Sequence, residues 1–245
     1  MRSVRVIDLE TTGNRPPAHG VCEIGWQDVS LVGDAWIVTA SRGSSLVNPG
    51  RTIPAVTQAV HHIIDEDVVG APLWPDIAPD VMRGHLVLAA HRASFEQRFC
   101  TPALTGGARW ICTWKCALRL WPGSPSFSNQ VLRYWRKPRG LDRNLGLPVH
   151  RALPDAYVTA HHLRDMLAEV SVEQLLEWSE LPGLLPRVVA GPDRGKAWSE
   201  LGSEALATWV RDRDEDVRYS AAFELARRGG TEPAPPPQPQ GQLFA

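Results

Sequence analysis

Two carboxylates near the start of the chain, Asp8 and Glu10, have the types and spacing that metal binding requires. They follow the apolar run 4–7, which predicts a buried strand. In an extended strand the side chains at i and i+2 share a face, so both carboxylates project together. Such a pair repels itself unless a cation neutralises it, and Mg²⁺ prefers oxygen ligands. The pair alone is also compatible with two solvated carboxylates at a strand end.

Two further groups of residues complement this pair. Glu96 lies at the predicted start of a helix, shortly after the apolar run 86–90. His150 and Asp155 are five residues apart, with the histidine on a predicted loop and Asp155 in the first turn of the following helix. Acidic side chains and a histidine in one site would suit metal-assisted chemistry on phosphates.

A basic stretch at 131–151 contains six basic residues and one acidic residue, Asp142. The basic residues are Arg133, Arg136, Lys137, Arg139, Arg143 and Arg151. We interpret this stretch either as a surface that contacts nucleic acid or as an ordinary solvated loop. Because the whole chain has a net charge of −1, any contact with nucleic acid must come from such a local patch.

These side chains must be positioned by an α/β arrangement of strands and short helices. Apolar runs predict strands at 4–9, 22–29, 35–47, 86–90 and 110–112, with the second and third paired. Helices are predicted at 54–60, 73–82, 95–100, from the end of the fifth strand to about 121, at 129–136 and at 154–170. Another is predicted after a capping box at Ser171, and two more at about 204–211 and 216–228. Ser94 is the predicted N-cap of the helix that begins at Phe95. The Gly-, Pro- and Arg-rich segment 138–149 predicts a loop.

Composition sets the class of protein. The 245 residues are 43% hydrophobic, which is enough for a substantial core. We expect a cytoplasmic protein with no membrane partner, because no stretch is long enough to span a bilayer and no signal-peptide pattern opens the chain. The four cysteines lack the spacing of a zinc site, so free buried thiols are expected.

The motifs D-x-E-T-T-G at 8–13, H-x-A-S-F-E at 91–96 and H-x-x-x-x-D at 150–155 resemble those of the DEDDh 3′→5′ exonucleases. Segments 110–123 and 191–198 resemble the exodeoxyribonuclease X branch of that superfamily, and the resemblance covers about residues 1–229. It implies an RNase H-like fold, a mixed five-stranded sheet flanked by helices. We expect an exonuclease domain at 1–170, a connecting helix and linker at 171–186, a small C-terminal module at 187–229 and a disordered Pro/Gln tail at 230–245.

The resemblance also implies a function, the release of 5′-mononucleotides from DNA 3′ ends by a two-metal mechanism, in repair or replication. The implied ligands of two Mg²⁺ or Mn²⁺ ions are Asp8, Glu10, Asp155 and Glu96, and His150 would be the general base. Thr11, Thr12, His61 and Arg92 would contact the substrate.

The chain departs from the family at two positions. The family usually has Asp where this chain has Glu96, and Asn where it has Arg92. Arg92 could bind phosphate, or it could pair with Glu96 and compete with metal. Two alternatives therefore stay open. One is an exoribonuclease on the same scaffold, since a single sequence does not reveal the 2′-hydroxyl contact that distinguishes RNA. The other is a catalytically weak protein that binds DNA ends and is recruited through its tail.

The last residues carry a possible partner signal. Gln240, Leu243 and Phe244 resemble the Q-x-x-L-F peptide by which bacterial replication and repair enzymes bind the sliding clamp. A flexible tail with two apolar anchors suits a groove on a partner. The alternative is a tail that only improves solubility.

Overall fold

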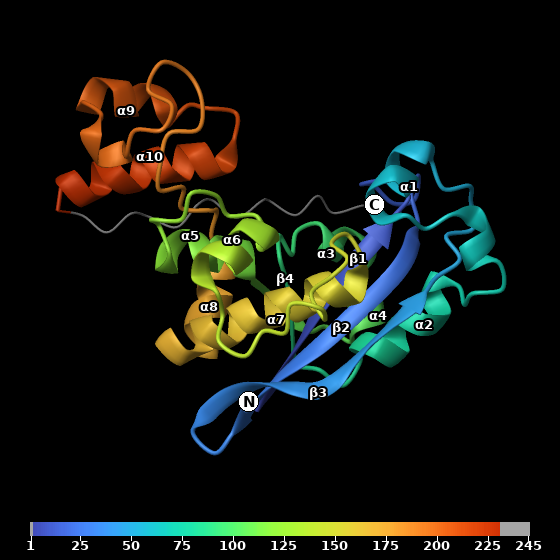
Figure 1. The fold of residues 1–245 in the computed structure, drawn as a ribbon. Helices are drawn as coiled ribbons and strands as arrows, with labels where there is room; N and C mark the ends of the chain where they lie inside the picture. Colours follow the sequence, from blue (N-terminus) through green and yellow to red (C-terminus); the bar gives the residue numbers. More distant parts are fainter. Residues whose placement is uncertain (1, 231–245) are drawn as a thin grey trace. The chain divides into compact units, whose positions relative to one another are not determined.

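A computed structural model describes residues 2–230, and its first compact unit has a mixed α/β fold around a five-stranded sheet (Figure 1). The strands are β1 (Ser3–Thr11), β2 (Val21–Val32), β3 (Ala35–Leu46), β4 (Val87–Ala90) and β5 (Arg109–Cys112). Their order in the sheet is β3-β2-β1-β4-β5. The first three are antiparallel neighbours, whereas β4 and β5 run parallel to β1. The predicted mixed sheet is confirmed.

The parallel β4 is buried at all four positions, as expected for a strand covered on both faces. It lies beside β1, so the chain leaving β4 toward Glu96 starts next to the strand that carries Asp8 and Glu10. The pairing of β1 with β2 shifts register between Glu10 and Thr11. Such irregularities bend a strand and change the direction of its side chains.

The α-helices agree closely with the predicted ranges. They are α1 (Ala55–His61), α2 (Trp74–Met82), α3 (Glu96–Phe99), α4 (Pro102–Thr105), α5 (Thr113–Leu120), α6 (Asn129–Arg136), α7 (Ala152–Glu169), α8 (Val172–Glu180), α9 (Ser203–Trp209) and α10 (Glu215–Arg228). Two 3₁₀ turns lie at Asp65–Val68 and Trp198–Glu200. The sequence missed α4 and these turns, because a single turn is too short to show a hydrophobic period.

The prediction that Ser94 caps a helix is wrong. Helix α3 begins at Glu96, its N-cap is Phe95, and no side chain caps it. The preceding residues instead form a turn closed by the backbone, in which the Phe95 N–H donates to the Arg92 carbonyl at 2.8 Å. Backbone hydrogen bonding therefore replaces the side-chain cap at this helix start.

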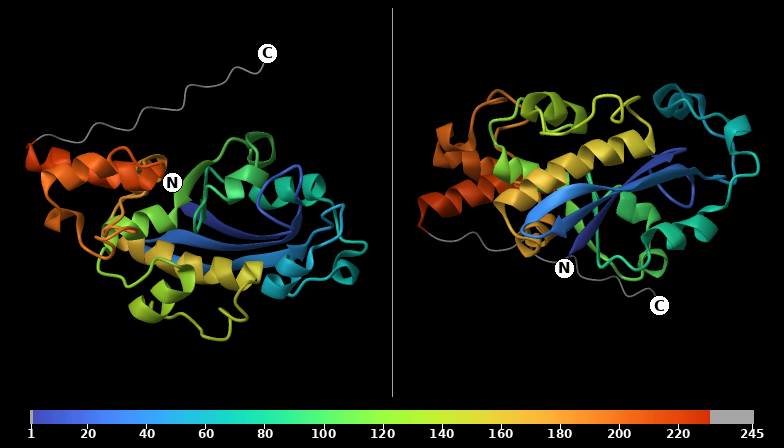
Figure 2. Two further views of the ribbon diagram at one scale, coloured as in Figure 1. Left: turned by 90° about the horizontal axis from the view of Figure 1, so that it is seen from above. Right: turned by 60° about the horizontal axis from the view of Figure 1, so that its bottom comes forward.

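Helix α7 lies along one face of β1, β2 and β3, as the two views of Figure 2 show. Gly25 of β2, the register partner of Asp8, permits this approach. A Cβ on Gly25 would lie 2.2 Å from the backbone of Ala152. The absence of a side chain there lets the first turn of α7 reach the face that carries the two β1 carboxylates.

The opposite face of the sheet carries a hydrophobic core. Ile7 and Leu9 of β1 pack there with Ile24 of β2 and with Val81 and Met82 of α2. Alternate residues of a strand point to opposite faces. Ile7 and Leu9, which flank Asp8, therefore anchor β1 in this core. The rigid apolar face thus holds the carboxylate-bearing face in place.

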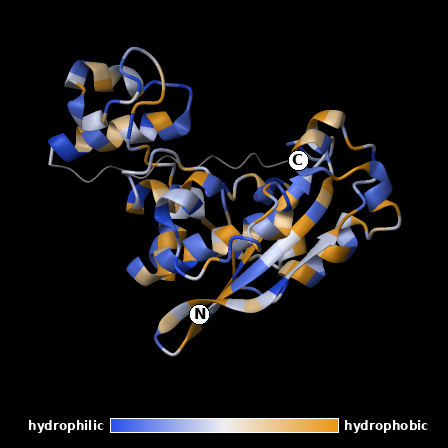
Figure 3. Ribbon diagram, viewed as in Figure 1, coloured by the Kyte–Doolittle hydropathy of each residue, from blue (hydrophilic) through white to orange (hydrophobic). Residues whose placement is uncertain are grey.

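The chain divides into two compact units. The first contains the residues up to Cys116 together with Ser124–Ser179, and the second contains Ala117–Gly123 and the residues from Glu180 onward. The second unit has its own core, in which Trp198 and Leu206 pack with Val217 and other apolar residues. Hydrophobic and hydrophilic stretches alternate along its helix α10 (Figure 3). The domain boundaries expected from the sequence stay a prediction.

Two further expectations concern the described residues. All four cysteines are free and buried, as predicted. No helix within residues 2–230 combines the length and apolar character needed to cross a membrane.

Candidate metal centre and active site

Three carboxylates from two elements meet where the end of β1 faces the start of α7. Asp8 and Glu10 extend from β1 and Asp155 from α7, and one oxygen of each lies within 4.8 Å of the others. The first two share a face because strand side chains alternate. Asp155 reaches them because α7 packs on that face. We call these three residues the carboxylate cluster.

Asp155 is oriented by its neighbours. The Gln130 side-chain amide donates to its Oδ1 at 2.8 Å, and the His150 backbone N–H donates to its Oδ2 at 2.7 Å. The Asn129 side chain donates to the Asp155 backbone carbonyl at 3.2 Å. Each carboxylate oxygen can accept more than one bond, so Asp155 retains capacity to bind a cation.

Glu96 adds a fourth carboxylate from the start of α3. Its side chain is 3% exposed, and its Oε2 has no hydrogen-bond partner among residues 2–230. A buried polar atom without a partner is rare and points to a missing ligand. Burial, and secondarily the charge of Glu10, raise the pKa of Glu96 to about 8. The charge of Glu96 in turn raises the pKa of Asp8, so this residue belongs electrostatically to the carboxylate cluster.

The cluster resists ionisation when no cation is present. Burial raises the pKa of Asp8 well above its usual range, and the charges of Asp155 and Glu10 raise it further. Burial and Asp155 likewise raise the pKa of Glu10 to about 8. A bound divalent cation would stabilise the charged carboxylates and reverse these shifts. A donor set made only of carboxylate oxygens fits hard ions such as Mg²⁺ and Mn²⁺.

His150 lies on the loop just before α7, as expected, and is exposed. Its backbone is left-handed, with φ of 59°, and its N–H is bonded to Asp155. This bond ties the histidine backbone to the carboxylate cluster while leaving the imidazole free of that contact. Histidine is the side chain that most readily exchanges a proton near neutral pH.

Sequence reasoning missed Glu23, which fixes the start of α7. Its buried carboxylate accepts two bonds from the Arg151 guanidinium, both at 2.9 Å, and one from the Ala152 N–H at 3.0 Å. Glu23 is also the register partner of Glu10. The signal in the sequence is an acid at 23 on the same strand face as Gly25. It could not be interpreted, because its partner lies 128 residues away.

We expect Glu23→Ala to destabilise the protein by about 2 kcal/mol, because it removes charge-assisted hydrogen bonds that anchor α7. Arg151 is partly exposed and can rehydrate, which keeps the loss below that of a fully buried pair. Urea unfolding at about pH 6 measures the effect. Glu10 holds its proton at that pH, so the loss of Glu23 does not also relieve a repulsion between these two carboxylates. Glu173→Ala is the matched control. Its pair with Arg109 is exposed, and its removal should cost under about 0.5 kcal/mol.

Three expected substrate-binding residues lie close to β1. The Thr11 hydroxyl donates to the Gly13 carbonyl at 2.7 Å, and the Thr12 hydroxyl accepts the Gly20 N–H at 3.0 Å. His61 is buried next to the Thr11 backbone, and its Nε2 lacks a partner within the described chain. Burial lowers the pKa of His61, which favours the neutral ring. The Thr12 hydroxyl closes the loop that follows β1, whereas His61 keeps a free ring nitrogen.

Arg92 follows β4 with a left-handed φ of 70°. Its guanidinium lies 4.1 Å from the ring centroid of Trp114, a cation–π contact. No hydrogen bond or ion pair joins Arg92 to Glu96 in the part of the chain that the structure describes. Trp114 therefore holds Arg92, and the pairing that would compete with metal is not formed.

The basic stretch is divided by the structure. Arg133 is buried and donates to the carbonyls of Gly146 and Arg143, so it holds the loop before His150. Arg136 pairs with Glu169 at 3.6 Å, and Arg151 pairs with Glu23. The exposed members are Lys137, Arg139 and Arg143. Half of the basic residues are thus structural, and only the exposed half could contact nucleic acid, which stays a prediction. The tail residues Gln240, Leu243 and Phe244 lie outside the described residues.

Comparison with known proteins places this geometry in context. The RNase_T exonuclease family model matches residues 6–100. Exodeoxyribonuclease 10 of Escherichia coli K12 is 37% identical over 200 residues, which cover 81% of this chain and 84% of the relative. DNA polymerase III subunit epsilon of Treponema pallidum is 28% identical over 172 residues, covering 66% of this chain and 74% of the relative.

Solved structures agree with these sequence matches. Exonuclease X in complex with 5′ overhanging duplex DNA matches with a TM-score of 0.57 and 34% identity, covering 72% of this chain and 99% of that one. Exonuclease I of E. coli with a dA16 oligonucleotide matches with a TM-score of 0.54 and 12% identity, covering 73% and 43%. The second likeness concerns the fold alone. Together they confirm the RNase H-like exonuclease fold.

Proposed function

Because this chain belongs to the exonuclease family of exodeoxyribonuclease 10, we propose that it is a metal-dependent 3′→5′ exodeoxyribonuclease that releases 5′-mononucleotides. One observation carries the proposal. Oxygens of Asp8, Glu10 and Asp155 lie within 4.8 Å of one another, beside a buried Glu96 oxygen that lacks a partner among residues 2–230. Phosphodiester hydrolysis is the chemistry that such a donor set serves in this family.

Four carboxylates would hold two Mg²⁺ or Mn²⁺ ions. Asp8, Glu10 and Asp155 would hold one, and Asp8 and Glu96 the other. Bound divalent ions stabilise charge that develops on phosphate oxygens and lower the pKa of water. Gln130 and the His150 backbone keep the Asp155 oxygens oriented for this role. The longer Glu96 side chain fits, because it is buried with one oxygen open to a ligand.

His150 would act as the general base that takes a proton from the attacking water. Its loop is restrained from two sides, by its own N–H bond to Asp155 and by Arg133, which donates to the Gly146 carbonyl at 2.6 Å. The exposed imidazole can pass its proton to solvent afterwards. Positioning by backbone bonds leaves both ring nitrogens available for proton exchange.

The terminal nucleotide would lie between β1 and α1. His61 offers a buried ring whose Nε2 has no hydrogen-bond partner among residues 2–230, and Thr11 and Thr12 follow the two β1 carboxylates. Arg92, held over Trp114, would place a positive charge beside the backbone of the scissile strand.

The test uses single-stranded and duplex oligonucleotides of DNA and RNA, labelled at the 5′ or the 3′ end, with Mg²⁺, Mn²⁺ or EDTA. We expect 3′-labelled DNA to lose its label as mononucleotide at once, while 5′-labelled DNA shortens stepwise and EDTA stops both. Faster degradation of RNA than of DNA would favour the exoribonuclease. Tight binding of DNA ends without hydrolysis under either metal would favour the catalytically weak binding protein.

The tail suggests how the enzyme reaches its substrate. We propose that Gln240, Leu243 and Phe244 bind the bacterial sliding clamp, which would place the activity in DNA repair or replication. Deleting residues 240–245 should abolish capture by immobilised clamp and leave nucleotide release intact. Capture that survives the deletion would refute the clamp proposal. The cytoplasmic location expected from the sequence stays a prediction.

A further inference from the structure

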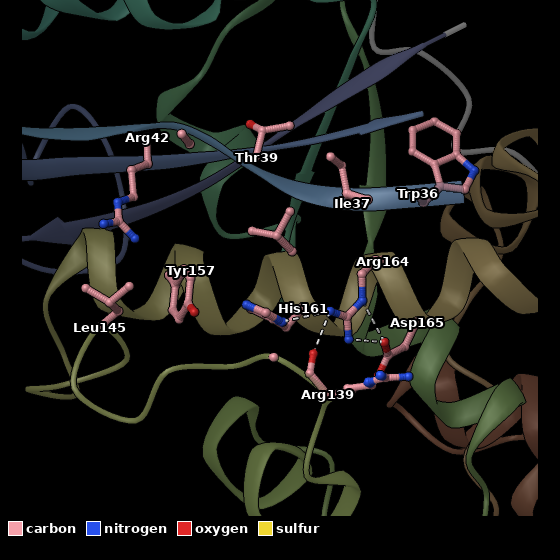
Figure 4. A pocket seen from close by; sticks show the side chains of 13 residues that line it. Trp36, Ile37, Thr39, Arg42, Arg139, Leu145, Tyr157, His161, Arg164 and Asp165 are labelled. Carbon is pink, nitrogen blue, oxygen red and sulfur yellow. Dashed lines mark hydrogen bonds and ion pairs between the residues drawn. The ribbon is translucent and has the colours of Figure 1, made fainter. Parts of the chain in front are cut away.

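A groove lies in the first unit, away from the carboxylate cluster. It has a volume of about 890 Å³ and lies between the edge strand β3, helix α7 and the loop at 139–145 (Figure 4). We call it the β3–α7 groove and define it by six of its lining residues. They are Trp36, Arg42, Arg139, Tyr157, His161 and Arg164.

The β3–α7 groove and the carboxylate cluster use opposite sides of α7. Tyr157, His161 and Arg164 follow Asp155 by two, six and nine residues. At 3.6 residues per turn these positions lie roughly 180° to 240° around the helix axis from Asp155. The groove is therefore separated from the cluster by the helix itself, about 10 Å thick. A ligand in the groove would not touch the metal centre.

The groove carries positive charge. Arg42 on β3 and Arg139 on the loop are both exposed. Asp165, the acid that lines the groove, accepts a bond at 2.9 Å from Arg164. That ion pair offsets the charge of Asp165, so Arg42 and Arg139 determine the potential of the groove. Arg164 also donates to the Arg139 carbonyl at 2.7 Å, which fixes this basic loop against α7.

Aromatic rings form part of the groove wall. The Arg42 guanidinium lies 5.9 Å from the centre of the Tyr157 ring, and Tyr157 meets His161 edge-on at 4.7 Å. The Tyr157 hydroxyl accepts the Asp142 N–H at 2.9 Å, which holds this ring in place. Trp36 lines the end of the groove on β3 (Figure 4). Tyr157 and His161 are buried and hold the wall in shape, whereas Trp36 is partly exposed and offers a stacking surface. The exposed arginines offer contacts to anions.

Two exposed arginines beside fixed aromatic rings are the chemistry by which proteins hold single-stranded nucleic acid without regard to sequence. We propose that the β3–α7 groove binds a single-stranded segment of the DNA substrate, outside the catalytic centre. The inference rests on the proposed function, because that function supplies the polyanion. Arg42 and Arg139 contact phosphates, and Trp36 stacks on a base.

Such a second attachment has a kinetic consequence. A strand held in the groove keeps its 3′ end near the carboxylate cluster at high effective concentration. Long strands can occupy both sites, whereas strands of about four nucleotides reach only one. The groove should therefore raise the affinity for long substrates and leave the rate of the chemical step unchanged.

The test measures binding of 5′-fluorescent single strands of about 4 and about 16 nucleotides to the full chain in EDTA. The variant is Arg42→Gln with Arg139→Gln, and the matched control is Arg2→Gln with Arg83→Gln. Arg2 and Arg83 are exposed arginines of the same unit that do not line the groove. For the long strand, the slope of log affinity against log salt should become shallower by about 1.4, at about 0.7 per lost phosphate contact. The control pair should leave the slope within about 0.3.

A second variant tests the aromatic part independently. Trp36→Ala should lower affinity for the long strand about tenfold, the usual size of one lost base stack. A long-strand slope unchanged by the double variant would overturn the proposal, as would an equal loss for short and long strands. Long-strand affinity unchanged by Trp36→Ala would likewise overturn it. Binding in EDTA does not depend on hydrolysis, so the unmodified protein's hydrolysis of the short strand in Mg²⁺ tests the catalytic proposal separately.

Discussion

Asp8→Asn is expected to reduce nucleotide release by about three orders of magnitude at saturating Mg²⁺. Asp8 is the one carboxylate that the proposed scheme assigns to both ions. Its loss would remove several kcal/mol of transition-state stabilisation, and each 1.4 kcal/mol corresponds to a tenfold change in rate. Initial rates on 3′-labelled DNA measure the effect.

Folding and catalysis can be separated in the same variant. Asp8 is half-buried, and desolvation together with the neighbouring like charges raises its pKa, so asparagine should leave the metal-free protein at least as stable as the original. Asp80→Asn, an isosteric change at an exposed position of α2, is the control and should keep full activity. If Asp8→Asn retained more than about a tenth of the rate, the assignment of Asp8 to both ions would be wrong.

Metal-free protein is expected to lose stability as the pH rises from about 5 to about 9. In the unfolded chain the glutamates titrate near pH 4.3, whereas in the folded chain Glu10 and Glu96 titrate at about 8. Between these values the folded state holds protons that the unfolded state has released. Stability therefore falls with rising pH until the folded groups have also ionised.

Mg²⁺ should reverse this loss, because it binds the ionised carboxylates. At a hundred times its dissociation constant it adds about 2.7 kcal/mol, or about 5 to 10 °C in Tm for a protein of this size. Thermal unfolding at pH 6 and pH 9, with Mg²⁺ or EDTA, measures both effects. An equal Mg²⁺ shift at the two pH values would contradict the role of Glu10 and Glu96 as ligands, and Asp8→Asn should lose the shift.

The structure accommodates both departures from the family pattern, Arg92 and Glu96. Glu96 is buried, and its Oε2 has no partner among residues 2–230. Arg92 lies over the ring of Trp114 instead of pairing with Glu96. The sequence left both outcomes for Arg92 open, because a positive side chain beside an acid predicts an ion pair as readily as a phosphate contact. Arg92 lies instead over Trp114, 22 residues further along the chain, so the ion pair is not formed, and the phosphate contact stays a prediction.

The sequence by itself determined the shared face of Asp8 and Glu10, the order of the motifs and most strands and helices. These features depend on local geometry, either the alternation of a strand or the hydrophobic period of a helix. The single-turn elements were missed because they are too short to show a hydrophobic period. The predicted Ser94 cap of α3 was wrong because a turn closed by backbone hydrogen bonding forms there instead.

Only the tertiary structure decided which charged residues are buried and what they contact. Glu23 anchors Arg151 across 128 residues, and Gly25 lets α7 approach closely enough for Asp155 to join Asp8. Residue type gives little information here, because a charge is buried only where a distant partner compensates for its lost hydration. The sequence thus indicated which carboxylates could act, whereas long-range packing brought them together.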